Sequence, residues 1–150
     1  MSAGRARAAR RALIAAAVLA FLGASWLVAR WLSTENAERD AVLGVLRAQA
    51  RGDADAVLRR LRCADAGCRA LARGNARALR GAGELEVVRY DSGTAHSLTT
   101  RTASTRVVWT TPGRLTTVQC VLVRRVGDPL RGTSVTLLRL SAPIERESGC

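Results

Sequence analysis

The sequence predicts an α+β protein in which an N-terminal transmembrane helix precedes three helices and a curved antiparallel sheet. Three observations lead to this fold class. An uncharged apolar run lies near the N-terminus, helical periodicity continues as far as Gly81, and runs rich in Thr and Val begin after Glu84. Because no helical pattern separates those later runs, we expect the strands to be antiparallel neighbours.

Residues 12–29, ALIAAAVLAFLGASWLVA, form the apolar run. A helix of that length covers roughly 27 Å, close to the hydrocarbon thickness of a bilayer. Trp31 and Leu32 extend it if Arg30 reaches the interface, so the predicted transmembrane helix is 12–32. Four arginines among residues 1–11 make that tail cytoplasmic and residues 33–150 extracytoplasmic.

A cleaved signal peptide is the alternative for this segment. Gly23, Ala24 and Ser25 have the small side chains of a cleavage site, but the apolar run continues beyond them. We therefore predict an uncleaved anchor in a single-pass protein of the cell membrane. Residues 12–32 would make its contacts with lipid.

The extracytoplasmic domain is basic, with nineteen arginines against twelve acidic residues after residue 32. The chain has no lysine, and this usage, with abundant Ala, Gly and Val, is typical of a GC-rich bacterial genome. A basic domain attracts anionic lipid, wall polymer or nucleic acid. Aromatic residues make up only 3% of the chain, too few to stack bases, so no nucleic-acid partner is expected. We expect the arginines to form a solvated surface.

Four cysteines beyond the anchor predict disulfides in an oxidising compartment. Three pairings are open to them. Cys63 and Cys68 flank a short loop that can close, so we expect the pairs Cys63–Cys68 and Cys120–Cys150. The second bond would tie the C-terminal segment to the sheet. Zinc is not expected, because His96 is the only histidine and no C-x-x-C pair occurs; no other cofactor is expected either.

Three helical segments are expected before the sheet. Residues 35–51 have apolar side chains at helical spacing, and Glu35 and Glu38 in the first turn suit the helix dipole. Gly52 suits the left-handed conformation that ends a helix, and Asp53 can cap the next one. A third helix, 69–80, stops at the Gly-Ala-Gly run that follows it.

Four strand-like runs follow, at 84–90, 98–111, 115–126 and 133–142. A Pro-Gly pair and the loop GDPLRG mark turns between the later ones. Alternation in the run 115–126 directs Cys120 and Leu122 to one face of the sheet and Val121 and Val123 to the other. Short connections without helices predict an antiparallel meander.

Helices followed by a curled antiparallel sheet resemble the nuclear transport factor 2-like superfamily, which has a cystatin-like fold. Residues 48–58, AQARGDADAVL, resemble the segment of that superfamily in which a Gly-Asp pair joins the first two helices. In element order the resemblance covers residues 35–142. With its anchor, the chain also resembles two membrane-tethered branches, the accessory proteins of actinobacterial Mce lipid importers and the inner-membrane scaffold proteins of type IV secretion systems. No motif chooses between them.

The resemblance implies a cone-shaped pocket, in which enzymes of this fold hold an acidic base, often Asp, and a donor such as Tyr. Tyr90 and Asp91 are those residue types here. Neighbours on a strand face opposite sides, so these two are not expected to share a pocket. His96 with Asp91 and Ser97 lacks the arrangement of a triad. No catalytic residue is predicted, and the chain is not expected to be an enzyme.

Trp109, Arg124 and Arg125 are the candidates for ligand or anion contact. Trp109 is expected in the core, unless it lines a pocket. One of the two consecutive arginines should face solvent and the other the concave face of the sheet, where it is the first residue to test for anion binding.

These features together predict a non-catalytic interaction or assembly module of a bacterial cell-envelope complex, with an envelope protein as its partner. Binding of a small apolar or anionic ligand in the concave sheet is the first alternative. A cryptic enzyme of the fold is the second. The identity of the partner, any ligand and self-association stay open.

Overall fold

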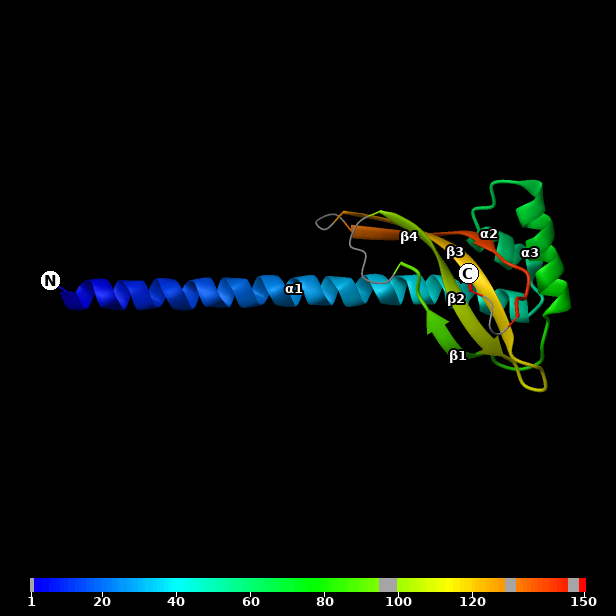
Figure 1. Cartoon of the computed structure of the whole chain (residues 1–150), viewed down its shortest axis with the longest axis horizontal. Helices are drawn as coiled ribbons and strands as arrows, with labels where there is room; N and C mark the ends of the chain where they lie inside the picture. The colour runs from blue at the N-terminus through cyan, green and yellow to red at the C-terminus, as the bar shows by residue number, and fades with distance from the viewer. Residues whose placement is uncertain (1, 95–99, 129–131, 146–148) are drawn as a thin grey trace. The chain divides into compact units, whose positions relative to one another are not determined.

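The computed structural model describes residues 2–94, 100–128, 132–145 and 149–150 (Figure 1). By its internal contacts the chain divides into two compact units, Met1–Thr34 and Glu35–Cys150. The helices and strands of the described residues are α1 (Ser2–Ala50), α2 (Ala54–Arg60), α3 (Ala66–Ala78), β1 (Glu86–Asp91), β2 (Arg101–Thr110), β3 (Thr117–Asp128) and β4 (Gly132–Leu140).

Helix α1 contains both the predicted transmembrane segment and the predicted first helix of the domain. Two helical segments, 12–32 and 35–51, were expected here, and the structure has one helix, Ser2–Ala50, that contains both. No Gly or Pro occurs in residues 24–43, so no residue there interrupts the helix. The upstream part of α1 is long and apolar enough to cross a bilayer, and its most apolar stretch buries no side chain. It could therefore anchor the chain in a membrane.

The strands form one open antiparallel sheet in the order β1-β2-β3-β4. The predicted α+β class and meander are confirmed, and each strand lies within three residues of its predicted bounds. Val121 and Val123 are fully buried on the face that α1 covers, whereas Cys120 and Leu122 are only partly buried. We call the face covered by α1 the inner face and the opposite one the outer face.

The core lies between the helices and the inner face. Val42, Val45 and Leu46 of α1 are fully buried in one cluster with apolar residues of α2, α3 and three strands. The connection after α2 and the helix α3 both contact the end of β4 (Figure 1). There Arg62 N donates to Leu137 O at 2.7 Å, and Asn75 Nδ2 donates to Ser141 O at 2.8 Å.

Turn chemistry sets the helix ends. Gly52 has a φ of 75°, the left-handed conformation expected after a helix, and Asp53 caps α2 by accepting a hydrogen bond from Ala56 N. Helix α3 begins at Ala66, three residues before the predicted start. Asp65 is the reason, because its side chain accepts from Cys68 N at 2.6 Å and so caps the helix within the loop between the cysteines.

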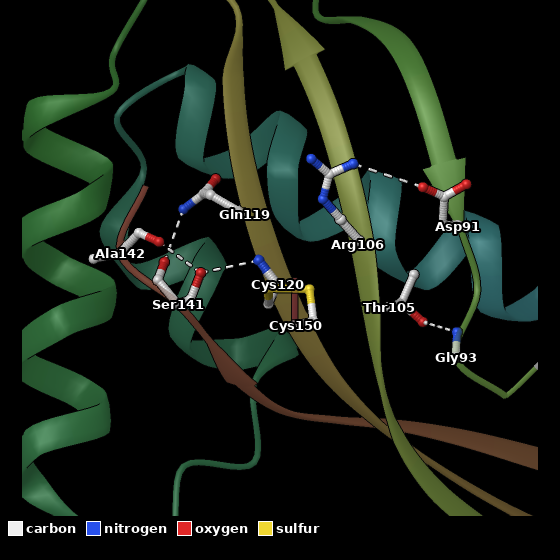
Figure 2. The surroundings of a disulfide bond; sticks show 9 residues. All are labelled: Asp91, Gly93, Thr105, Arg106, Gln119, Cys120, Ser141, Ala142 and Cys150. Atoms are coloured by element: carbon white, nitrogen blue, oxygen red, sulfur yellow. Dashed lines mark hydrogen bonds and ion pairs between the residues drawn. A yellow bond between two sulfur atoms is a disulfide. The ribbon is translucent and has the colours of Figure 1, made fainter. Parts of the chain in front are cut away.

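Both expected disulfides are present, Cys63–Cys68 and Cys120–Cys150, with Cα–Cα distances of 5.5 and 5.7 Å. The second joins β3 to Cys150 on the outer face (Figure 2). Next to it, Ser141 Oγ accepts a hydrogen bond from Cys120 N at 2.9 Å. Two disulfides fit a domain that folds in an oxidising, extracytoplasmic compartment.

Candidate functional site

A carboxylate and a guanidinium are buried together between α1 and the inner face. Glu38 comes from α1 and Arg125 from β3, and Arg125 Nη2 lies 2.8 Å from Glu38 Oε2, with each side chain 1% exposed. Arg125 Nη1 also donates to Thr94 O at 3.2 Å. Burying such a pair costs free energy because both charged groups lose their hydration. The pair is therefore stable only when further hydrogen bonds satisfy its remaining polar atoms.

Four hydroxyl groups supply those bonds to the carboxylate. Tyr90, Ser92 and Thr105 donate to Glu38 Oε1 at 3.1, 2.9 and 2.8 Å. Thr94 Oγ1 donates to Oε2. The hydroxyl donors come from β1, the segment after it and β2, and Arg125 comes from β3, so one carboxylate links α1 to three strands. We call these residues the Glu38 cluster: Glu38, Tyr90, Ser92, Thr94, Thr105 and Arg125.

The cluster holds its charges in fixed states. Burial by itself raises the pKa of Glu38, but the hydrogen bonds from Thr94, Thr105 and Ser92 and the charge of Arg125 outweigh it, so the pKa lies below its usual value. Burial, and then the negative charge of Glu38, raises the pKa of Tyr90 well above its usual value. At neutral pH the carboxylate is therefore ionised and the phenol protonated.

This arrangement does not suit acid–base catalysis. A general base needs a lone pair that a substrate proton can reach. Both oxygens of Glu38 already accept hydrogen bonds within the protein, and the residue is fully buried. The bonds of Glu38 instead hold α1 against the sheet.

An amide network binds the C-terminal end of α1 to the sheet. Gln49 Nε2 of α1 donates to Gln119 Oε1 at 2.8 Å, and the Trp109 indole N–H donates to the same oxygen at 3.0 Å. Gln119 Nε2 donates in turn to Ser141 O at 3.0 Å, which also accepts from Asn75 (Figure 2 shows the Gln119 bond). The network joins α1, α3, β2, β3 and the end of β4.

The three candidate contact residues lie in different environments. Trp109 is 2% exposed, and its indole N–H is used in the amide network. Arg125 faces inward as expected for one of the arginine pair, but it already binds the carboxylate of Glu38. Arg124 is exposed on the outer face. The structure therefore does not bring these three side chains into one pocket.

Tyr90 and Asp91 face opposite sides, as their adjacency on a strand predicts. Tyr90 belongs to the Glu38 cluster, whereas Asp91 Oδ2 lies 2.8 Å from Arg89 Nε and 3.7 Å from Arg106 Nη1 (Figure 2 shows the Arg106 pair). His96 and Ser97 lie outside the described residues. Over the described ranges, no group of three His, Cys, Asp or Glu side chains is placed to hold a metal ion.

Sequence reasoning missed Glu38 and Gln49 as buried residues. It assigned Glu38 to the helix dipole, although a signal for burial exists. Glu38, Val42, Val45 and Gln49 recur at spacings of three and four and therefore share one helical face. Two polar residues within an apolar stripe indicate buried partners, and those partners lie far away in sequence.

Two open pockets lie outside the Glu38 cluster. One of about 430 Å³ lies against the outer face and is lined by residues that include Leu71, Leu122 and Arg139. Another of about 350 Å³ lies beside α2, with Asp40, Arg60 and Arg62 in its lining. Neither includes any member of the Glu38 cluster.

Comparisons with protein-family models, with curated proteins and with solved structures give no match for this chain. Its function is therefore inferred from its own residues.

Proposed function

We propose that this protein is a non-catalytic interaction or assembly module of a bacterial cell-envelope complex. Residues 12–32 hold it in the membrane, and its α+β domain lies outside the cytoplasm. We propose further that the domain has the nuclear transport factor 2-like arrangement, in which helices cover the concave face of a curled sheet. The observation that supports this function is that buried side chains fill the inner face of the sheet.

An enzyme or small-ligand binder of this fold would use the inner face, and here its polar side chains are occupied. Glu38, Trp109 and Arg125 are each at most 2% exposed. A ligand that sought Arg125 would have to displace Glu38 and leave a buried carboxylate without its counter-charge. The surfaces that stay accessible are the outer face, the helix surfaces and the edge strand β1, which suit contacts with another protein.

The ends of the anchor support the proposed location. Four arginines precede the apolar run, and the bias in positive charge sets the orientation of a membrane helix. Both disulfides lie downstream of the anchor, in the part of the chain that would need an oxidising compartment.

Photocross-linking in the native envelope tests the proposal. A photoreactive amino acid is placed at one exposed position on each accessible surface, Ala70 on α3, Val88 on β1 and Arg124 on the outer face, with Leu115 in the β2–β3 turn as a comparison. An interaction module should give a discrete adduct with one partner protein at the position on the interacting surface and little or none at the comparison position. Diffuse adducts of equal intensity at all four positions would contradict it.

The same preparations test the alternative that the domain binds a small ligand. The protein, extracted in detergent under mild conditions, is analysed by native mass spectrometry. A stoichiometric small molecule that Arg125→Met releases, together with an absence of discrete adducts, would replace the interaction module by a ligand-binding function.

A further inference from the structure

The positive charge of the extracytoplasmic domain is concentrated in one segment. Residues 59–83 contain seven arginines and a single acidic residue, Asp65, whose side chain is engaged as the cap of α3. The rest of the domain, 33–58 and 84–150, has twelve arginines and eleven acidic residues and is nearly neutral. The charge is therefore not a uniform solvated surface. It belongs to the α2–α3 hairpin, which the Cys63–Cys68 disulfide braces.

Within the hairpin, α3 presents an ordered row of charge. Arg69, Arg73 and Arg77 are exposed and spaced by four, so they lie along one side of the helix about 6 Å apart. None of the three forms an ion pair with any described residue. We call these three residues the arginine ridge.

The surface of α3 beside the ridge consists of small side chains and lacks large apolar groups. The exposed positions of α3 other than the arginines hold only Ala and Gly. A Cβ added at Gly74, midway along the helix, would meet nothing within 4 Å. Glycine costs about 1 kcal/mol relative to alanine inside a helix, and nothing within the described domain requires it at this position.

These features favour a protein partner over other polyanions. A helix that lies on a membrane has Trp, Phe or Leu side chains to insert beside its basic residues, and the exposed side of α3 has none. Single-stranded nucleic acid is bound on aromatic platforms, which are also missing there. Guanidinium groups pair in bidentate fashion with carboxylates, and a helix with Glu or Asp at every fourth residue repeats at the same spacing as the ridge.

We propose that the arginine ridge of α3 docks an acidic helix of a partner protein. This inference rests on the proposed function and names the chemistry of the partner. The acidic residues of that helix, spaced by four, face Arg69, Arg73 and Arg77, and its backbone approaches α3 over Gly74.

The test uses the full chain in nanodiscs of uncharged lipid and a fluorescent helical peptide as the probe. The peptide carries Glu at every fourth residue in an Ala-rich sequence, and a scrambled peptide of equal composition distributes the same charges around the helix. Arg69→Gln/Arg73→Gln/Arg77→Gln is compared with Arg51→Gln/Arg101→Gln/Arg124→Gln, which removes the same charge from exposed positions outside the hairpin. Gly74→Leu, which adds bulk at a position where a Cβ would meet nothing within 4 Å, is the second variant.

We expect the ridge variant to weaken binding of the ordered peptide by about tenfold at low salt and the matched variant by less than about twofold. Gly74→Leu should weaken binding while leaving the melting temperature unchanged or higher. The inference fails if the wild type does not bind, if both triple variants lose affinity equally, or if the scrambled peptide binds as well as the ordered one.

A parallel experiment with anionic phosphatidylglycerol vesicles tests whether the arginine ridge binds a membrane surface instead of an acidic helix. Loss of vesicle binding in the ridge variant, with peptide binding unchanged, would overturn the inference in favour of a lipid surface. Discrete photoadducts at Val88 or Arg124 but not at Ala70 would overturn it while leaving the proposed function intact.

Discussion

Glu38 is a single carboxylate that joins a helix to three strands, so its removal should affect the whole inner face. We predict that Glu38→Gln lowers the free energy of unfolding by about 3 to 5 kcal/mol, because it leaves Arg125 buried without a counter-charge. Urea unfolding monitored by circular dichroism measures the change. Glu84→Gln removes an exposed carboxylate and should change stability by less than about 0.5 kcal/mol.

A second variant separates charge from packing. If the cost arises from the unpaired guanidinium, Glu38→Gln/Arg125→Met should recover part of the lost stability, since replacing both members of a buried pair is often neutral. A double variant that is less stable than the sum of the two single variants predicts would contradict this account of the pair.

The same carboxylate predicts the acid side of the stability profile. The pKa of Glu38 in the folded protein lies below its ordinary value of 4.5, so the unfolded chain binds the proton more readily. Its contribution is therefore fully present above that ordinary value and is lost as the pH falls through the lower folded pKa. Unfolding measured from pH 7 to pH 3 should show this loss in the wild type and a shallower slope in Glu38→Gln. Equal slopes in both proteins would refute it.

At the scale of elements, the two disulfides should differ in their contribution because they close loops of different length. Cys120 and Cys150 are 30 residues apart and Cys63 and Cys68 are five apart. The chain-entropy model assigns about 3.6 kcal/mol to the longer loop and about 2 kcal/mol to the shorter. We predict that Cys120→Ser/Cys150→Ser lowers the melting temperature more than Cys63→Ser/Cys68→Ser. The reverse order in calorimetry would show that local packing at α3 outweighs loop closure.

The elements were largely predictable because their signals are local. Thr- and Val-rich runs marked the four strands, and Gly52 with Asp53 marked the end of one helix and the start of the next. The beginning of α3 was missed because Asp65 caps it within a loop that its small residues suggested was flexible. The continuity of α1 was missed because a change from apolar to charged residues suggested a boundary, although no breaker accompanies it.

The candidate site was less predictable because its partners are distant in sequence. Glu38 and Arg125 are 87 positions apart, and only the packing of α1 on the sheet brings them together. Alternation along β3 placed one of the two arginines inward, but the carboxylate that it meets had no local signal beyond the helical stripe. Long-range pairing of this kind follows from the tertiary fold, which a local pattern does not encode.

For the whole molecule, the arginines before the apolar run predict its orientation. A reporter active only outside the cytoplasm, fused after residue 150, should give signal, and the full-length protein should stay in the membrane fraction. Replacing the four arginines among residues 5–11 by Glu should reduce that signal. A mature protein that begins near Ser25 would show that the segment is cleaved instead of serving as an anchor.

The burial of Glu38 against Arg125 also constrains how this sequence can diverge. Loss of either residue alone leaves the other charge buried without a partner and lowers the free energy of unfolding. A domain of ordinary stability, about 5 to 15 kcal/mol, would lose a large share of that stability. The two positions should therefore be inherited as a unit, so that descendants of this chain retain both charges or replace both with apolar residues. Sequences with only one of the pair should be rare and should carry a compensating change among the hydroxyl residues of the Glu38 cluster.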